Sequence, residues 1–225
     1  MTTIETVTLQ SRGLSVWERF RRRKLALTGM VLITIALFGA IFAPWLTPYD
    51  PNTQMFDGLT IEGAPMAPSA QFLLGTDLLG RDLLTRILYG ARTSLIIGLV
   101  ANGVSLIIGT LVGVTAGYFQ GFIGGLLMRL TDLMMAFPAL LLAICLASIF
   151  QPSLWIVAMV IAIVNWVQTA RVLYSETSSL AQREFIAAEK TLGASHPRIL
   201  FRHILPHLVP MIIVWGTLGI STTVL

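Results

Sequence analysis

The chain has 225 residues, of which 55% are hydrophobic and only 12% are charged, and its formal net charge is +4. Soluble domains carry about 25% charged residues, so this composition excludes an ordinary soluble domain. It indicates an all-α integral membrane protein, a polytopic helical bundle. The single cysteine, Cys145, lies in an apolar run, and an intrachain disulfide is therefore excluded.

A basic tail at residues 1–24 precedes the first apolar run, at 25–45. This run is longer than the roughly 7–15 residues of a signal-peptide core, and no small-residue cleavage site follows, so we expect a signal anchor that stays in the membrane. Trp17 and Phe20 fit a short interfacial helix, although we favour an ordinary positively charged flank. The basic residues of the tail are Arg12, Arg19, Arg21, Arg22, Arg23 and Lys24.

The segment 46–93 is polar and is expected to lie outside the membrane. Its first part has the Pro, Asn and Asp residues that favour turns. From Thr76 onward, leucines and isoleucines recur at helical spacing, which predicts an amphipathic helix on the outer membrane surface. Asp77 is the expected N-cap of that helix.

Further apolar runs bring the expected number of membrane spans to five, because a bilayer core needs about 20 apolar residues per helix. The third span is short, and we expect it to begin earlier than its apolar run. Pro138 should kink or loosen it. The runs that follow the first lie at 94–117, 133–150, 154–169 and 208–225.

Small residues in the second span form a repeated pattern. Gly109, Gly113 and Gly117 stand four residues apart and share one flat helical face. Such a face lets another backbone approach closely. It predicts tight packing, within the chain or against a partner chain, rather than a ligand site.

Polar residues in the third and fourth spans have two interpretations each. Arg129 and Asp132 are three residues apart and form a possible ion pair, which would either brace the helix or serve transport. Asn165 and Gln168 would either line a polar path or hydrogen-bond across helices, and we favour the second interpretation.

The distribution of lysine and arginine predicts the orientation of the chain. The tail and the loop 171–206 are rich in these residues, whereas 46–93 holds more acidic than basic residues. The tail and the loop are therefore expected in the cytoplasm. This topology accounts for the positive net charge, and no nucleic-acid partner is predicted. The basic residues of the loop are Arg171, Arg183, Lys190, Arg198 and Arg202.

Signals for catalysis and ion coupling are missing from the sequence. Lys24 and Lys190 are the only lysines, and neither follows a Gly-rich loop, so no ATPase is predicted. His196, His203 and His207 lack a further acid or cysteine at ligand spacing, and no metal site is predicted. Spans one, two, four and five hold no carboxylate, which argues against an ion-coupled pump.

The loop 171–206 carries the most informative motif. It has Ala187-Ala188, then Gly193, and then Leu205-Pro206. This pattern resembles the cytoplasmic coupling loop of permeases in binding-protein-dependent ABC importers, which reads Glu-Ala-Ala, three residues, Gly, nine residues, Ile-x-Leu-Pro. The resemblance assigns the ATPase-coupling role to Ala187, Ala188, Glu189, Gly193, Ala194, Ser195, Leu205 and Pro206.

This motif departs from the family pattern at several positions. Counting back from Gly193 places Ala187 at the Glu position and Glu189 at the second Ala position, and His203 stands where Ile is usual. A salt bridge from position 187 is therefore not expected. The helix–turn–helix geometry should persist, because alanine is a good helix former and Gly193 supplies the turn.

Other segments resemble the second type of permease in the dipeptide, oligopeptide and nickel group of ABC importers. The resemblance covers most of the chain, and its strength lies in the order of many weak matches. They stand at 22–27, 42–44, 48–51, 74–82, 89–95, 116–119, 128–129, 132, 137–138 and 152–155.

The resemblance implies a bacterial inner-membrane permease of the type I importer fold, which forms half of a pathway for di- or oligopeptides, nickel or glutathione. It implies a second homologous permease, two ABC ATPase subunits that bind ATP and Mg, an external solute-binding protein and membrane lipid as partners, with no cofactor in this chain. The family has a sixth span, so we expect this chain to be truncated at its C-terminus. A membrane anchor or assembly subunit and an ion-coupled secondary transporter are the alternatives.

Overall fold

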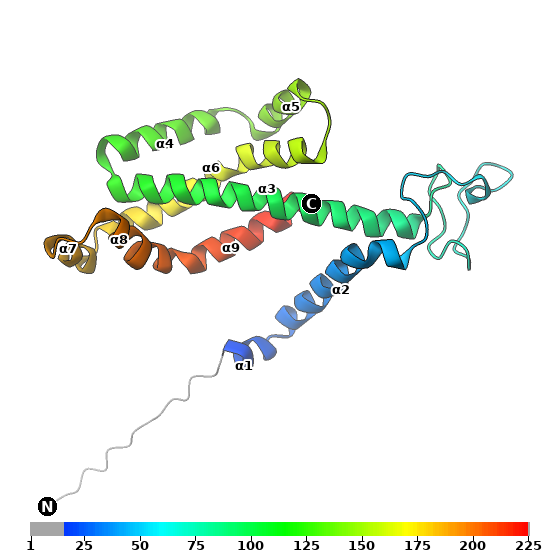
Figure 1. Cartoon of the computed structure of the whole chain (residues 1–225), viewed down its shortest axis with the longest axis horizontal. Coiled ribbons are helices and arrows are strands. Elements are labelled where there is room, and N and C mark those ends of the chain that lie inside the picture. The colour runs from blue at the N-terminus through cyan, green and yellow to red at the C-terminus, as the bar shows by residue number, and fades with distance from the viewer. Residues whose placement is uncertain (1–15, 225) are drawn as a thin grey trace, which may run out of the picture. The chain divides into compact units, whose positions relative to one another are not determined.

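The computed structural model describes residues 16–224, and these divide into two compact units on either side of the boundary between Arg92 and Thr93 (Figure 1). Arg12 of the basic tail and Leu225 at the end of the fifth predicted span lie outside the described residues. Within them the chain is helical, with irregular segments and two isolated β-bridges.

The first unit begins with two helices. Helix α1 (Val16–Arg21) is the short helix that we had considered in the tail, and the rings of Trp17 and Phe20 stack on it. Helix α2 (Lys24–Leu46) has the length and hydropathy of a membrane span, which confirms the first predicted span.

The segment 47–82 is ordered by side chains and turns, with one short 3-10 helix, η1 (Phe56–Gly58). The buried Thr76 hydroxyl donates to the Gly58 carbonyl (2.5 Å) and accepts from the Met66 N–H (2.8 Å). Phe72 is also buried, against the ring of Tyr49. These contacts give an irregular segment a fixed fold.

The amphipathic helix predicted from Thr76 is present, but its predicted first residue and its predicted N-cap are wrong. Helix α3 (Leu83–Phe119) begins later, and Asp82 caps it by accepting from the Thr85 N–H (2.7 Å) and hydroxyl (2.6 Å). The predicted surface helix and the second predicted span are thus one helix. A turn at Gly80, with φ of 72°, keeps the preceding residues out of it.

Asp77, the predicted cap, instead closes the turn before the helix. Its carboxylate accepts from the N–H groups of Leu79 (2.9 Å) and Arg81 (3.0 Å) and pairs with the Arg81 guanidinium (2.8 Å). Burial alone would raise the pKa of this carboxyl, but the hydrogen bonds from Arg81 and Leu79 outweigh it and lower the pKa. The turn is therefore favoured while Asp77 is ionised.

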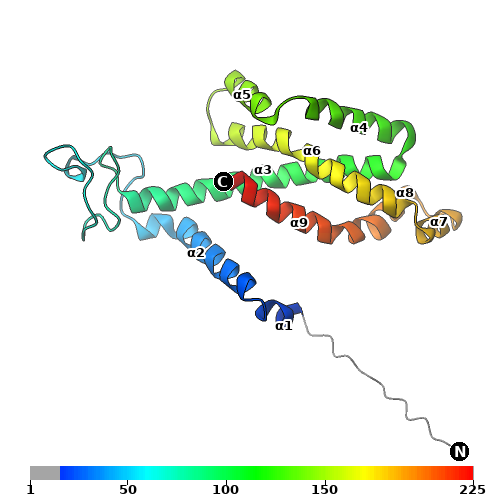
Figure 2. The ribbon, with the colours of Figure 1, turned by 180° about the vertical axis from the view of Figure 1, so that it is seen from behind.

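The second unit contains the C-terminal part of α3 and the remaining helices (Figure 2). Within residues 16–224, four helical segments have the length and hydropathy of membrane spans, and the bent pair α4–α5 makes up to five. The helices of this unit after α3 are α4 (Gly121–Ala136), α5 (Ala139–Ile149), α6 (Leu154–Ala181), α7 (Glu184–Thr191), α8 (His196–Ile199), η2 (Leu200–Ile204) and α9 (Leu205–Val224).

Helices α3 and α6 pack together through the glycine stripe. A Cβ at Gly109 would lie 2.8 Å from the Trp166 carbonyl oxygen, and one at Gly117 would lie 2.7 Å from the Tyr174 carbonyl oxygen. Both sequences advance in the same direction along this contact, so α3 and α6 are parallel.

The bent pair α4–α5 must return the chain between these parallel helices. The two helices meet at 86°, where Phe137 is extended and Pro138 lacks an N–H. The predicted break at Pro138 is confirmed. Helix α4 lies beside α6 in both views (Figures 1 and 2). The connection supports counting the pair as one span.

Helix α9 runs antiparallel to α3. Gly216 lies against Leu106, and Gly98 lies against Val224. The helices that contain the fourth and fifth predicted spans extend beyond them: α6 continues to Ala181, and helical structure begins at His196 rather than at position 208. The polar continuation of α6 is stable because it is amphipathic, with a buried face of Leu173, Thr177 and Ala181.

Candidate functional site

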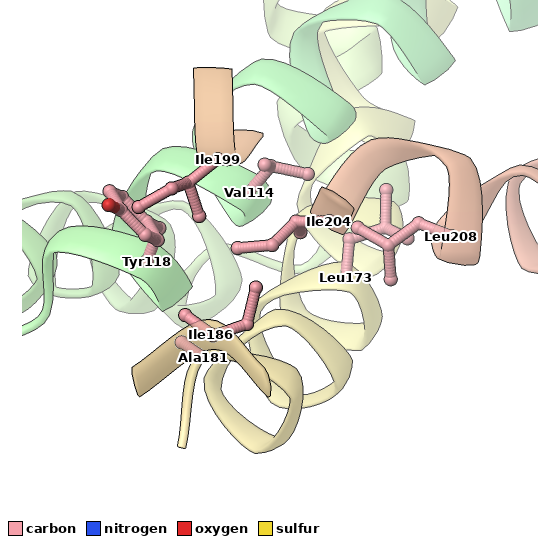
Figure 3. Packing of buried hydrophobic residues seen from close by; sticks show 8 residues of the cluster. All are labelled: Val114, Tyr118, Leu173, Ala181, Ile186, Ile199, Ile204 and Leu208. Carbon is pink, nitrogen blue, oxygen red and sulfur yellow. The ribbon is translucent and has the colours of Figure 1, made fainter. Parts of the chain in front are cut away.

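The predicted coupling loop packs on the end of the second unit where α3 ends. Its buried residues come from α7, α8 and η2, and they point into one cluster with residues of α3, α6 and α9 (Figure 3). Ile186, Ile199 and Ile204 have no exposed surface. The cluster consists of Val114, Tyr118, Leu173, Ala181, Ile186, Ile199, Ile204 and Leu208.

Gly193 forms the turn between α7 and α8. Its φ is 77°, a left-handed conformation, and the turn predicted at this residue is confirmed. The Gly193 N–H donates to the Lys190 carbonyl (3.1 Å), and the Ala194 N–H donates to the Glu189 carbonyl (3.0 Å). This pair of bonds is a Schellman motif. It satisfies the last carbonyls of α7 and directs the chain back toward the cluster.

The outward side of the loop carries an apolar surface. Ala187 and Ala188 are exposed on α7. Leu192 is 83% exposed and Phe201 is 69% exposed. Ser195 is exposed and Ala194 is half-buried, where the chain turns from α7 back toward the cluster. A loop that buries its isoleucines and exposes a leucine and a phenylalanine has the composition of a protein contact surface.

Two positions that depart from the family pattern lie beside each other. The Glu189 carboxylate is 3.5 Å from His203 Nε2, so α7 contacts η2 through these side chains. The two form an ion pair only when His203 is protonated. The π-helical turn of η2 lies just before Pro206, whose missing N–H interrupts regular helical bonding. Leu205 and Pro206 thus start α9.

Tyr118 attaches the loop to the end of α3. Its hydroxyl lies 2.8 Å from His196 Nδ1, and Lys190 Nζ lies 5.3 Å from the centre of its ring. Both the apolar cluster and this polar contact therefore hold α7 and α8 in place. Sequence reasoning missed Tyr118, because nothing along the chain connects it with a segment more than 70 residues away.

The ion pair predicted between Arg129 and Asp132 is wrong, because Asp132 has another partner. Asp132 of α4 pairs with Arg171 of α6. Spacing along one helix predicts only local partners, whereas α4 and α6 lie side by side. The side chains of Asp132 and Arg171 are both half-exposed, and the pair links two helices near the loop end of the unit.

A second feature of this unit is a polar cavity of about 310 Å³ between α3, α6 and α9. Asn102, Ser105, Asn165 and Gln168 are among the residues that line it. Among residues 16–224, no cluster of His, Cys, Asp and Glu has the arrangement of a metal site.

Comparisons with known proteins give consistent matches. Residues 109–224 match the family described as "binding-protein-dependent transport system inner membrane component", and residues 11–68 match the N-terminal transmembrane domain of oligopeptide transport permease C.

The chain is also similar to three permease proteins over most of its length. It is 40% identical to a di/tripeptide transport system permease protein of Pseudomonas aeruginosa, over 93% of this chain and 69% of the relative. It is 34% identical to an oligopeptide transport system permease protein of Bacillus subtilis, over 96% and 70%. It is 38% identical to a glutathione transport system permease protein of Escherichia coli, over 93% and 68%.

Proposed function

The chain belongs to the family of binding-protein-dependent transport system inner membrane components, and on this premise we propose that it forms half of a peptide pathway that an ATPase drives through the loop 171–206. It is a multi-pass inner-membrane permease of an ABC importer and is not itself catalytic. Separate ATPase subunits bind and hydrolyse ATP, so this chain needs no cofactor of its own.

A transport system of this family includes an ATPase, a second permease and a binding protein. In the proposed assembly, a homologous permease lies beside this chain and two ATPase subunits lie in the cytoplasm. The binding protein docks outside, on the segment 46–93, and lipid surrounds the spans. The tail 1–24 lies in the cytoplasm.

The anchored loop is the observation that carries the proposal. Ile186, Ile199 and Ile204 are buried against the spans, whereas Leu192 and Phe201 are exposed. A loop fixed on one side and apolar on the other can transmit the motion of a bound subunit to the helices. Closure of the ATPases on ATP would then move α7 and α8 as one body and switch the pathway between its outward and inward openings.

The proposed solute is a short peptide, glutathione included. The names of the three relatives specify di/tripeptides, oligopeptides and glutathione, and these solutes share amide bonds. The spans of this chain need only admit such a solute, while the binding protein selects it.

The proposed topology is tested by accessibility. With Cys145→Ser as background, single cysteines at Thr60 and Ser179 are expected to react with an impermeant thiol reagent from opposite sides of the membrane, because the first lies in the segment 46–93 and the second in the loop 171–206. Both residues are exposed. Labelling from the same side would contradict the orientation.

The coupling role is tested by Gly193→Val. A Cβ at this position meets no atom within 4 Å, so the cost comes from the left-handed φ alone, about 1 kcal/mol or more. We expect normal membrane levels of the chain, because the spans are untouched, with weaker ATPase co-purification and lost uptake. Solute binding to the external protein should not change.

Gly63→Val is the matched control. Gly63 also has a positive φ, of 78°, and open space around it, but it lies in the segment 46–93. It carries the same backbone strain without touching the loop, so ATPase co-purification should stay at the unaltered level. Intact co-purification and uptake in Gly193→Val would refute the coupling role.

A further inference from the structure

The polar cavity of the second unit is built by three helices that are distant in sequence. Asn102 and Ser105 come from α3, Asn165 and Gln168 from α6, and Thr222 from α9. Among the described residues 16–224, no charged side chain lines it. The lining therefore offers amides and hydroxyls, which are the groups that hydrogen-bond to peptide bonds.

The asparagine of α3 has a structural task in this cavity. The Asn102 amide donates to the Gly216 carbonyl (2.7 Å) and lies against Gly219, where any larger residue would collide with it. It thereby joins α3 to α9. The Asn102 side chain therefore has its hydrogen-bond partner within the chain, and it stabilises the wall of the cavity.

The two amides of α6 differ from Asn102. Asn165 and Gln168 are both exposed, and within residues 16–224 neither side chain makes a hydrogen bond. The interhelical hydrogen bonds that we had favoured for them are therefore not formed in the described part of the chain. They stand three residues apart, so they share one face of α6, and that face borders the cavity.

Their depth makes this exposure informative. At 1.5 Å per residue, Asn165 lies roughly 16 Å and Gln168 roughly 21 Å along α6 from its first residue, so both fall within a bilayer core of about 30 Å, with Gln168 toward the end at which the loop 171–206 begins. An amide that faces hydrocarbon without a partner costs several kcal/mol. These two amides must therefore meet water, a passing solute or another protein chain.

A second cavity touches the same residue. Its volume is about 260 Å³, and it lies at the bend of α4 and α5, lined by Met134, Met135 and Phe137 together with Gln168. Methionine adapts its shape to varied apolar groups. Gln168 thus stands between a polar cavity and an adaptable apolar one, an arrangement that suits a peptide bond with a variable side chain.

We infer that Asn165 and Gln168 are solute-contacting residues of the translocation path, which hydrogen-bond to the peptide groups of the solute while Asn102 holds the wall. This inference rests on the proposed function, because it assumes that solute crosses between these helices. It extends that function by identifying two of the side chains past which the peptide moves.

Accessibility in the assembled importer is the first test. With Cys145→Ser as background, Asn165→Cys and Gln168→Cys are made in the complete complex and treated with a sulfonated, membrane-impermeant methanethiosulfonate. Both cysteines should react, and a peptide accepted by the importer should slow the reaction. Ile107→Cys is the control, because Ile107 is apolar and 61% exposed on α3 near the level of Gly109; it should not react.

Transport selectivity is the second test. The solute is radiolabelled dialanine or glutathione, whichever the unaltered importer takes up. Gln168→Leu and Asn165→Leu put an apolar side chain of comparable size in place of the amide and remove the hydrogen bonds, so uptake at low solute concentration should fall about fivefold for each. ATPase co-purification should remain unchanged, which a loss of folding would not allow.

The outcomes separate this inference from the function on which it rests. If the unaltered complex shows no ATP-dependent uptake, the proposed function fails whatever the labelling shows. If it transports normally while both cysteines stay unreactive, the amides contact another chain, and the inference is overturned. Unchanged uptake in both leucine variants would also overturn it.

Discussion

Gly113→Leu is expected to destabilise the helical arrangement of the second unit strongly and to lower its unfolding temperature. A Cβ at this position would lie 3.0 Å from the Leu173 side chain and closer still to the Ala170 carbonyl oxygen. Because a backbone carbonyl cannot rotate away, α3 and α6 must separate. The cost should be about 3 kcal/mol, at the upper end for overpacking. Thermal unfolding of the purified chain in detergent measures it.

The same helix offers a control for this substitution. Gly103 is also a glycine of α3, but a Cβ there would meet nothing within 4 Å. Gly103→Leu should therefore unfold at nearly the same temperature as the unaltered chain. Equal unfolding temperatures for Gly113→Leu and Gly103→Leu would show that the glycine stripe does not hold α3 and α6 together.

Ile186→Asp should detach α7 from the spans. Ile186 is completely buried in the cluster at the base of the loop. A carboxylate there loses the apolar contacts and has no cation in the cluster, so the loop should be destabilised by at least about 3 kcal/mol. We expect rapid proteolysis between α6 and α8, loss of ATPase co-purification and loss of uptake, with the spans still inserted.

The neighbouring residue provides the matched control. Ala187 is exposed on the same helix, and Ala187→Asp places the same carboxyl group in solvent. Its proteolysis pattern should match that of the unaltered chain. If Ile186→Asp is equally resistant to protease, the buried cluster does not anchor the loop.

The sequence was most informative where a single residue type dictates backbone geometry. Pro138 predicted the break in the third span, and Gly193 predicted the turn after α7, because both effects are local. The glycines at 109, 113 and 117 predicted a close contact but not that α6 makes it. A glycine stripe on one helix predicts that another helix packs against it. Which helix does so depends on how all the helices are arranged.

The errors in the prediction concern choices between similar groups. Asp77 and Asp82 are both able to cap a helix, and the turn at Gly80 decides in favour of Asp82. Arg129 and Arg171 are both able to pair with Asp132, and the neighbouring position of α6 decides in favour of Arg171. The anchoring isoleucines of the loop were missed because the segment was interpreted by its charges.

Site-specific cross-linking tests the proposed ATPase docking site most directly. A benzophenone-maleimide attached to Ala188→Cys, in the Cys145→Ser background of the assembled importer, probes the exposed face of α7. On illumination, this chain should become joined to an ATPase subunit, whereas the same reagent on Thr60→Cys should not reach one. An importer that transports solute while Ala188→Cys yields no ATPase adduct, or an adduct only with another chain, would contradict the account.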